Sequence, residues 1–149
     1  MRKSEVIKIM DDGKELTFKV TQMPATKAER WANRAAFLII GAGKSVGRVK
    51  SVEDFGIDEA LKVLATMDYE KVEPLYNELI ECCSFMSGNT EIQCSQDTID
   101  AQITDVMNLY KLRLEALKIN FSFFMNVLQF QMQAQNTITF KKNTRKSSR

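Results

Sequence analysis

Histidine is absent from this chain of 149 residues. That absence excludes imidazole as a general acid or base, the Ser-His and Cys-His nucleophile pairs, and every zinc site with a histidine ligand. The cysteines do not take its place: Cys82 and Cys83 are adjacent, Cys94 stands apart, and none has the Cys-x-x-Cys spacing of a metal or redox motif. We therefore expect no metal, no cofactor and no enzymatic activity.

The chain also has little net charge and no long apolar run. Its 21 basic and 19 acidic residues leave a net charge of +2, which indicates no strongly charged partner. The most apolar segment contains Lys118, Asn120 and Asn126, so it is a poor membrane span. Because no secretory signal is evident at the start, we expect a cytosolic protein with reduced thiols. The length and the 44% apolar content fit one soluble domain.

Proline and glycine are scarce, and neither occurs between residues 98 and 134. Apolar residues recur there at steps of three and four, which predicts one long helix with Ser95, Asp97 and Thr98 as candidate N-caps. The inward side would carry Ile99, Ile103, Val106, Tyr110, Leu114, Leu117, Phe121, Phe124 and Leu128. The outward side of the first half would carry Asp105, Asn108, Lys111, Glu115 and Lys118.

The second half of this helix differs from the first. From Ile119 to Phe130 the apolar side chains point nearly all the way round. A helix of that kind must be covered on more than one side. We therefore expect that either the rest of the chain or a partner covers it.

The N-terminal part of the chain carries strand and turn signals. Residues 5–10 and 15–21 alternate loosely around Asp12-Gly13, which predicts a β-hairpin that leans on the helices. Its free edge could accept a strand from another subunit. Thr26 and Glu29 have the spacing of a capping box, so we expect a helix from there to about Ile40, ended by Gly41. Its buried stripe would be Ala28, Trp31, Ala32, Ala35, Leu38 and Ile39.

The middle of the chain is expected to alternate loops and helices. Residues 41–56 read as a flexible connector, although they contain Gly43-Lys44-Ser45. A phosphate-binding loop would need glycine at position 38, which is Leu38, and a preceding strand, so we do not expect one. We expect a short helix over 58–67, a turn over 68–74, a helix from Pro74 to about Met86, and a loop over 90–97 with at most a few extended residues.

The fold class we predict is mainly α: a helical domain with an N-terminal β-hairpin and a long C-terminal helix. This single domain would span residues 1–138. Residues 139–149 are basic and lack apolar side chains after Phe140, which predicts a disordered tail.

Three stretches together resemble a known family. They are Phe18 to Ala32 (FKVTQMPATKAERWA), Val72 to Cys83 (VEPLYNELIECC), and Leu112 to Lys118 (LRLEALK) followed by Phe123-Phe124. In order and spacing they are similar to the tail assembly chaperones of long-tailed phages and of prophages, over about residues 15 to 130. The motifs are not catalytic signatures, so the resemblance depends on their order and spacing.

The resemblance implies a role in virion assembly in the host bacterial cytoplasm. Such chaperones coat the tape measure protein, keep this long apolar chain soluble, help to bring tail tube protein to it, and are absent from the mature virion. A programmed frameshift often produces a longer form whose extra domain contacts the tube protein. By this resemblance the chain would be the short form.

The partner-binding residues we predict lie on the last helix: Phe121, Phe123, Phe124, Met125, Leu128 and Phe130. Phe121 and Phe124 are in phase with the inward stripe, so the alternative that they are core residues is the stronger one for these two. Phe123 and Phe130 are off that stripe, and a contact with a partner or a second subunit is equally open for them.

Two other functions remain open from the sequence. The first is a structural helical subunit that stays in a particle and forms homo-oligomers through its C-terminal helix. The second is a nucleic-acid accessory protein that uses the basic tail. The chain has no recognition-helix pattern, so we expect neither nucleic acid nor membrane as a partner.

Overall fold

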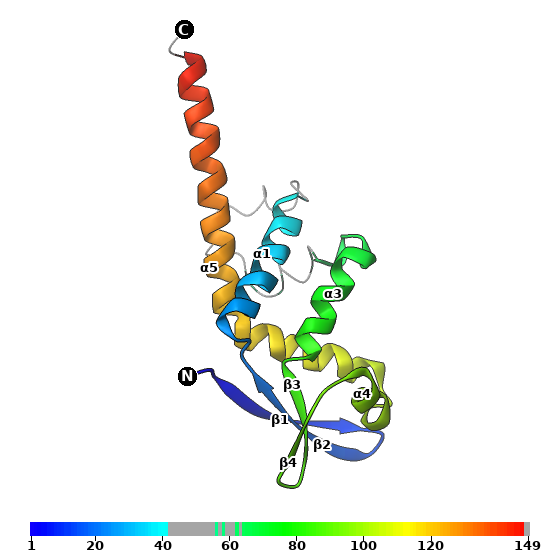
Figure 1. Cartoon of the computed structure of the whole chain (residues 1–149). Coiled ribbons are helices and arrows are strands. Elements are labelled where there is room, and N and C mark those ends of the chain that lie inside the picture. Colours follow the sequence, from blue (N-terminus) through cyan, green and yellow to red (C-terminus); the bar gives the residue numbers. More distant parts are fainter. Residues whose placement is uncertain (42–55, 57, 59–61, 63, 148–149) are drawn as a thin grey trace.

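The computed structural model describes residues 1–41, 56, 58, 62 and 64–147. It confirms the predicted fold class, a mainly helical chain with an N-terminal β-hairpin and a long C-terminal helix (Figure 1). Its elements are β1 (Ser4–Asp11), β2 (Lys14–Thr21), α1 (Ala25–Gly41), α3 (Tyr69–Ile80), β3 (Cys83–Ser87), β4 (Thr90–Gln93), α4 (Gln96–Gln102) and α5 (Val106–Ser147).

The N-terminal hairpin forms as predicted. β1 and β2 pair antiparallel from Ser4↔Thr21 to Asp11↔Lys14. Asp12 and Gly13, between the strands, have φ angles of 49° and 79°. Positive φ at both central residues is the requirement of a type I′ turn, which matches the twist of the two strands.

The edge of β2 is covered by a second hairpin that the sequence did not reveal. We expected helix up to Met86, but α3 ends at Ile80 and β3 begins at Cys83, so that prediction is wrong. β3 pairs with β2 and with β4, which gives a four-stranded antiparallel sheet in the order β1-β2-β3-β4. Pairing with β2 buries Cys83, and this tertiary contact overrides the helical pattern of the segment.

Both predicted helix starts in the first half also differ from the structure. α1 begins at Ala25, so Thr26 lies inside the helix and cannot be its N-cap. The Pro24 carbonyl instead accepts the Ala28 N–H at 2.8 Å. α3 begins at Tyr69, so Pro74 lies inside this helix and not in its first turn.

The buried stripe of α1 agrees with the sequence in most positions. Trp31 is a core residue, as predicted: its indole Nε1 donates to the Leu75 carbonyl at 3.0 Å, and its ring meets Phe124 edge-on at 5.8 Å. Ala36 is buried in addition, and Leu38 is only partly buried. The four buried alanines of α1 have small side chains, which allow this helix to lie close to α5.

The helix predicted over residues 98–134 is two helices. Ser95 caps α4 as expected, accepting the Thr98 N–H at 3.3 Å, but the chain is extended at Ile103 and α5 starts only at Val106. The buried Asp11 carboxylate accepts the N–H groups of Thr104 and Asp105 at 2.7 and 3.1 Å. The break thus comes from an acceptor on the hairpin, which local sequence cannot show.

The inward side of α5 also differs near its start. Val106 and Tyr110, predicted inward, are exposed, whereas Asn108, predicted outward, is fully buried. The Asn108 side chain donates to the Met10 carbonyl at 3.1 Å. This bond to the edge strand turns the helix so that Asn108 and Leu112 face the core.

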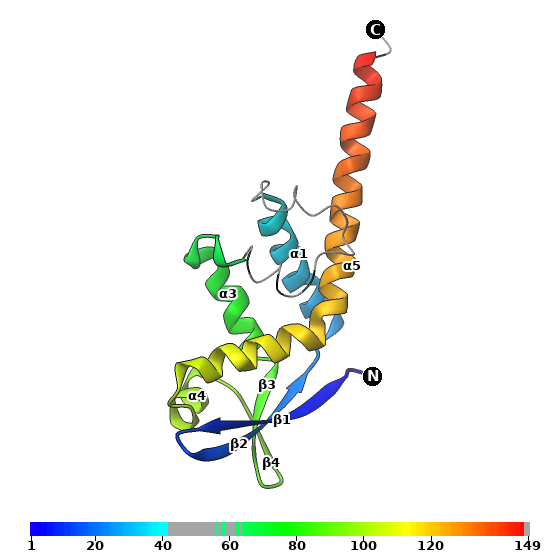
Figure 2. The same cartoon turned by 180° about the vertical axis from the view of Figure 1, so that it is seen from behind.

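α5 bends sharply where its colour passes from yellow to orange (Figures 1 and 2). We call residues 106–119 the N-terminal arm and residues 120–147 the C-terminal arm. Gln22 donates to the Ile119 carbonyl at 3.0 Å, and Asn120 donates to the Ala116 carbonyl at 2.8 Å while accepting the Met23 N–H at 2.9 Å. Side chains that bond to backbone carbonyls within a helix, as at Ala116 and Ile119, are a recognised cause of a helix bend.

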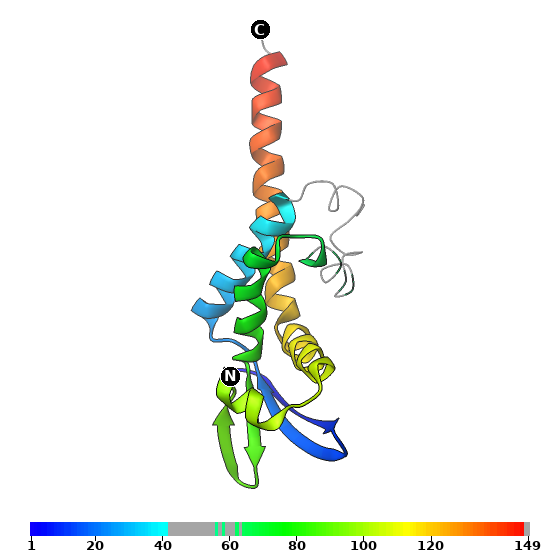
Figure 3. The ribbon, with the colours of Figure 1, turned by 90° about the vertical axis from the view of Figure 1, so that its right-hand side faces the viewer.

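Parts of the prediction lie outside the described residues. The connector with Gly43-Lys44-Ser45 and residues 59–61 and 63 of the helix expected over 58–67 belong there; of the residues described in that helix, Leu64 is buried as expected. The helical ribbon of α5 continues to Ser147 and extends beyond the other elements (Figure 3). The division into a domain of residues 1–138 and a tail of 139–149 stays a prediction.

Candidate partner-binding surface

One side of the C-terminal arm is covered by α1. Phe124 and Leu128 are each 1% exposed, and Phe124 packs against Trp31. Gln131 continues this contact by donating to the Asn33 side chain at 3.3 Å. Phe124 and Leu128 are therefore core residues in the single chain, and a partner could reach them only if α1 separated from α5.

Two of the predicted binding residues lie at the border of this contact. Phe121 and Met125 are partly buried and pack against the core, with the Phe121 ring 6.1 Å from that of Phe124. They leave some surface accessible beside the α1 contact. We expect them to flank a partner rather than to anchor it.

The other two predicted residues stand free of the core. Phe123 is 40% and Phe130 67% exposed. They are seven residues apart, so they point to the same side of the helix about 10 Å from one another. Val127, between them, is partly buried. We call these three residues, Phe123, Val127 and Phe130, the aromatic face.

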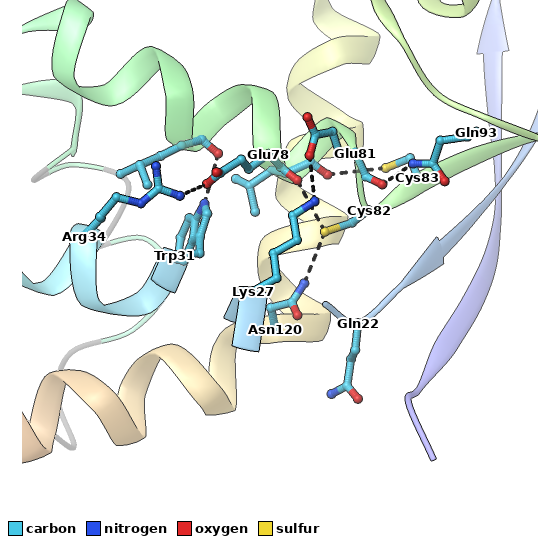
Figure 4. Close-up of polar contacts among 12 residues, drawn as sticks. Gln22, Lys27, Trp31, Arg34, Glu78, Glu81, Cys82, Cys83, Gln93 and Asn120 are labelled. Carbon is cyan, nitrogen blue, oxygen red and sulfur yellow. Dashed lines mark hydrogen bonds and ion pairs between the residues drawn. The ribbon is translucent and has the colours of Figure 1, made fainter. Parts of the chain in front are cut away.

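Polar contacts surround the bend from which the C-terminal arm extends (Figure 4). Asn120, at the bend, contacts the Cys82 sulfur at 3.7 Å in addition to its two backbone bonds. Arg34 of α1 forms an ion pair with Glu78 of α3, and Lys27 of α1 forms one with Glu81, the residue after α3, at 2.6 Å. The end of β2, the helix α1, the end of α3 and the bend of α5 thus meet at one junction, from which the C-terminal arm extends.

The thiols near this junction are unreactive by their surroundings. Burial raises the pKa of Cys82 and of Cys94 to about 11, and it also raises that of Cys83. At neutral pH all three are protonated, and the thiolate is the reactive form. Within the described part of the chain, no group of three or more Cys, Asp or Glu side chains could hold a metal ion.

Sequence reasoning missed a second exposed apolar area, on the N-terminal arm. Val106, Met107 and Tyr110 are all more than half exposed there. Local sequence contained no signal of this area, because the polar Asn108 fitted the predicted outward side and is buried only through its bond to the Met10 carbonyl. No helix within the described ranges is both long and apolar enough for a bilayer.

Comparison with known proteins identifies the family. A family model described as phage tail assembly chaperone protein, TAC, matches residues 14–133. The match runs from β2 through the aromatic face, and it covers most of the chain. No curated protein and no solved structure gives a significant match. The chain belongs to the phage tail assembly chaperones, a family of non-enzymatic proteins whose partners are tail proteins and which act during assembly in the host.

Proposed function

We propose that this chaperone binds the tape measure protein through its aromatic face and keeps it soluble in the host bacterial cytoplasm until tail tube subunits assemble around it. The observation that supports this is the uncovered second apolar side of the C-terminal arm. α1 covers the side of Phe124 and Leu128, and within the described residues Phe123 and Phe130 remain exposed. After assembly the chaperone would leave, so it would be absent from the mature virion.

The geometry suits a helical client. Two phenylalanines two turns apart on a straight arm can enter the groove between ridges of a second helix. Aromatic side chains provide large contact areas with little loss of conformational entropy. Met125 beside them can repack against varied sequences, which a chaperone of one very long client requires.

Recruitment of the tail tube protein is the second part of the proposal. A longer form produced by frameshifting would carry the main contact with the tube protein. The short form would then act chiefly on the tape measure protein. Two forms sharing one client-binding arm would place tube subunits along the client.

Co-expression tests the proposal directly. A tape measure protein from the same genome is expressed with the intact chain, with a Phe123→Ser and Phe130→Ser double variant, and with Phe37→Ser. Phe37 is 56% exposed on α1, so it is a matched control for removing an exposed phenylalanine elsewhere. We expect the soluble client to fall at least fivefold with the double variant and to be unchanged with the control.

Two outcomes would contradict the proposal. If the client is equally insoluble with and without the intact chain, this chain alone is not its chaperone. If the folded double variant keeps the client as soluble as the intact chain does, the aromatic face is not the binding site.

A second candidate function uses the same arm differently. The exposed aromatic face and the extended end of α5 would also suit pairing with a second copy in a structural subunit that stays in the particle. Mass spectrometry of purified virions separates the two functions. The chaperone should be absent, whereas a structural subunit would be present in many copies per tail.

A further inference from the structure

A second surface lies on the other side of the bend, between α3, α4 and α5. It is a groove of about 910 Å³ whose lining includes Glu73 and Ile80 of α3, Ile99 and Asp100 of α4, and Leu109 and Arg113 of α5. We call it the Arg113 groove. Ile80, Ile99 and Leu109 are buried or partly buried core residues, so they give the groove an apolar floor.

Arg113 is held in this groove by two aromatic rings. Its guanidinium carbon lies 5.4 Å from the ring centre of Tyr76 and 5.5 Å from that of Tyr110. Tyr76 is partly buried, and this burial raises the pKa of its hydroxyl group. Contacts of this kind orient the guanidinium plane but satisfy none of its N–H donors.

Arg113 also lacks an acceptor. Its Nε is buried with no hydrogen-bond partner, and within the described part of the chain no carboxylate lies at ion-pair distance from it. Arg113 as a whole is only partly buried, and of its nitrogens only Nε is buried without a partner, so the terminal N–H groups can meet a carboxylate, which accepts two parallel bonds from a planar guanidinium. The position therefore favours an acceptor that comes from outside the chain.

The charge around the groove indicates what kind of molecule brings that carboxylate. Three basic residues (Arg2, Lys27, Arg113) and three acidic residues (Glu73, Glu81, Asp100) line it, so its net charge is zero. A polyanion such as nucleic acid gains nothing from such a lining. A peptide with an apolar side, one carboxylate for Arg113 and a basic residue near Glu73 or Asp100 complements it in full.

We propose that the Arg113 groove binds an amphipathic segment of a tail protein, whose apolar side lies on Ile80, Ile99 and Leu109 and whose Asp or Glu side chain pairs with Arg113. This depends on the family's tail protein partners and is independent of the aromatic face. The chaperone would then hold its partners at two places, on opposite sides of the bend.

Peptide binding to the full chain tests this assignment. The probes are fluorescent, overlapping peptides that span the tape measure protein and the tail tube protein encoded with this chain. We expect at least one to bind with a tenfold or greater loss of affinity in Arg113→Met, which keeps the packing stem and removes the charge. Lys111→Met is the control, since Lys111 is exposed on the same arm, and it should change affinity less than twofold.

Further variants exclude a merely structural role for Arg113. Replacing the acidic residue of the bound peptide by Gln should cause the same loss, and combining it with Arg113→Met should add nothing. Arg113→Lys, which keeps the charge but not the two-pronged geometry, should weaken binding at least threefold and serves if Arg113→Met does not fold. If Arg113 had only a structural role, its replacement would lower the affinity for all peptides equally. The loss would then not depend on the acidic residue of the peptide.

Three results would overturn the proposal. One is that no peptide loses affinity in a folded Arg113 variant. Another is that a single-stranded oligonucleotide, and no peptide, binds in an Arg113-dependent way. The third is that peptides lose affinity only in the Phe123→Ser and Phe130→Ser variant, which would support the proposed function while removing the groove as a site.

Discussion

The two arms of α5 are parts of one helix in opposite situations. The N-terminal arm lies against the sheet and α3, and polar groups set its position, since Asn108 bonds to β1 and Arg113 lies between two tyrosines. Beyond Asn120, the C-terminal arm lies against α1 mainly through the buried side chains of Phe124 and Leu128, and it leaves Phe123 and Phe130 exposed. The comparison teaches that large apolar side chains on a helix need not be buried: only the C-terminal arm carries phenylalanines, and it leaves Phe123 and Phe130 exposed.

The largest expected effect is on the free energy of unfolding. It should distinguish two neighbouring phenylalanines that lie on different sides of the C-terminal arm. Phe124→Ala removes a fully buried ring against Trp31 and should lower the free energy of unfolding by about 3–5 kcal/mol. Phe123→Ala, one residue away, should lower it by less than about 1 kcal/mol. Urea unfolding measures both. Equal losses would show that the second side is covered as well.

The bend between the arms should respond to Asn120. Asn120→Leu removes the acceptor of the Met23 N–H and the donor to the Ala116 carbonyl, at a cost of about 1–3 kcal/mol. We expect α5 to straighten in this variant, so the distance between spin labels on Glu5 and Gln133 should change. Asn126→Leu, at an exposed position on the same arm, is the control. An unchanged distance in Asn120→Leu would mean that other contacts make the bend.

The start of the N-terminal arm should respond to Asp11. Asp11→Ala leaves the N–H groups of Thr104 and Asp105 without their acceptor, which should cost about 1–2 kcal/mol, as for loss of a helix cap. Hydrogen exchange of these two amides should accelerate in the variant. Glu15→Ala is the control, because Glu15 is exposed on the same hairpin. It should leave the exchange rates of the two amides unchanged. Unchanged exchange in Asp11→Ala would show that the break between α4 and α5 is set by the helices themselves.

The smallest effect, near zero at neutral pH, concerns the thiols below the bend. The pKa of Cys82 and of Cys94 is raised to about 11 in the folded chain from an ordinary value of 9, so the unfolded chain loses these protons first. Stability should therefore be unaffected below pH 9 and fall as pH rises from 9 to 11. At pH 8, alkylation of the folded chain should be at least tenfold slower than in urea. Fast alkylation would indicate an open junction.

Local signals were sufficient for some elements of the fold. Asp12-Gly13 between alternating strands predicted the hairpin, and the spacing of Trp31 and the alanines predicted most of the buried side of α1. The out-of-phase positions of Phe123 and Phe130 separated them from the core residues Phe124 and Leu128, which agrees with their exposure. Their binding role stays a prediction.

The remaining features depend on residues far apart in sequence. β3 forms because β2 offers a free edge, the break before α5 requires Asp11, and the bend requires Gln22. None of these partners lies within 60 residues of the segment it changes, so no window of local sequence contains the signal. For the same reason the Arg113 groove, built from three helices, could not be predicted.

The bend separates an extended part of α5 whose length follows from its residue count. From Asn120 to Ser147 the arm extends about 40 Å at 1.5 Å per residue. If each copy lies along a helical client, it occupies a comparable stretch of that client. The number of copies needed would then increase in proportion to the client's length, so phages with longer tails would need more chaperone per tail in a fixed ratio.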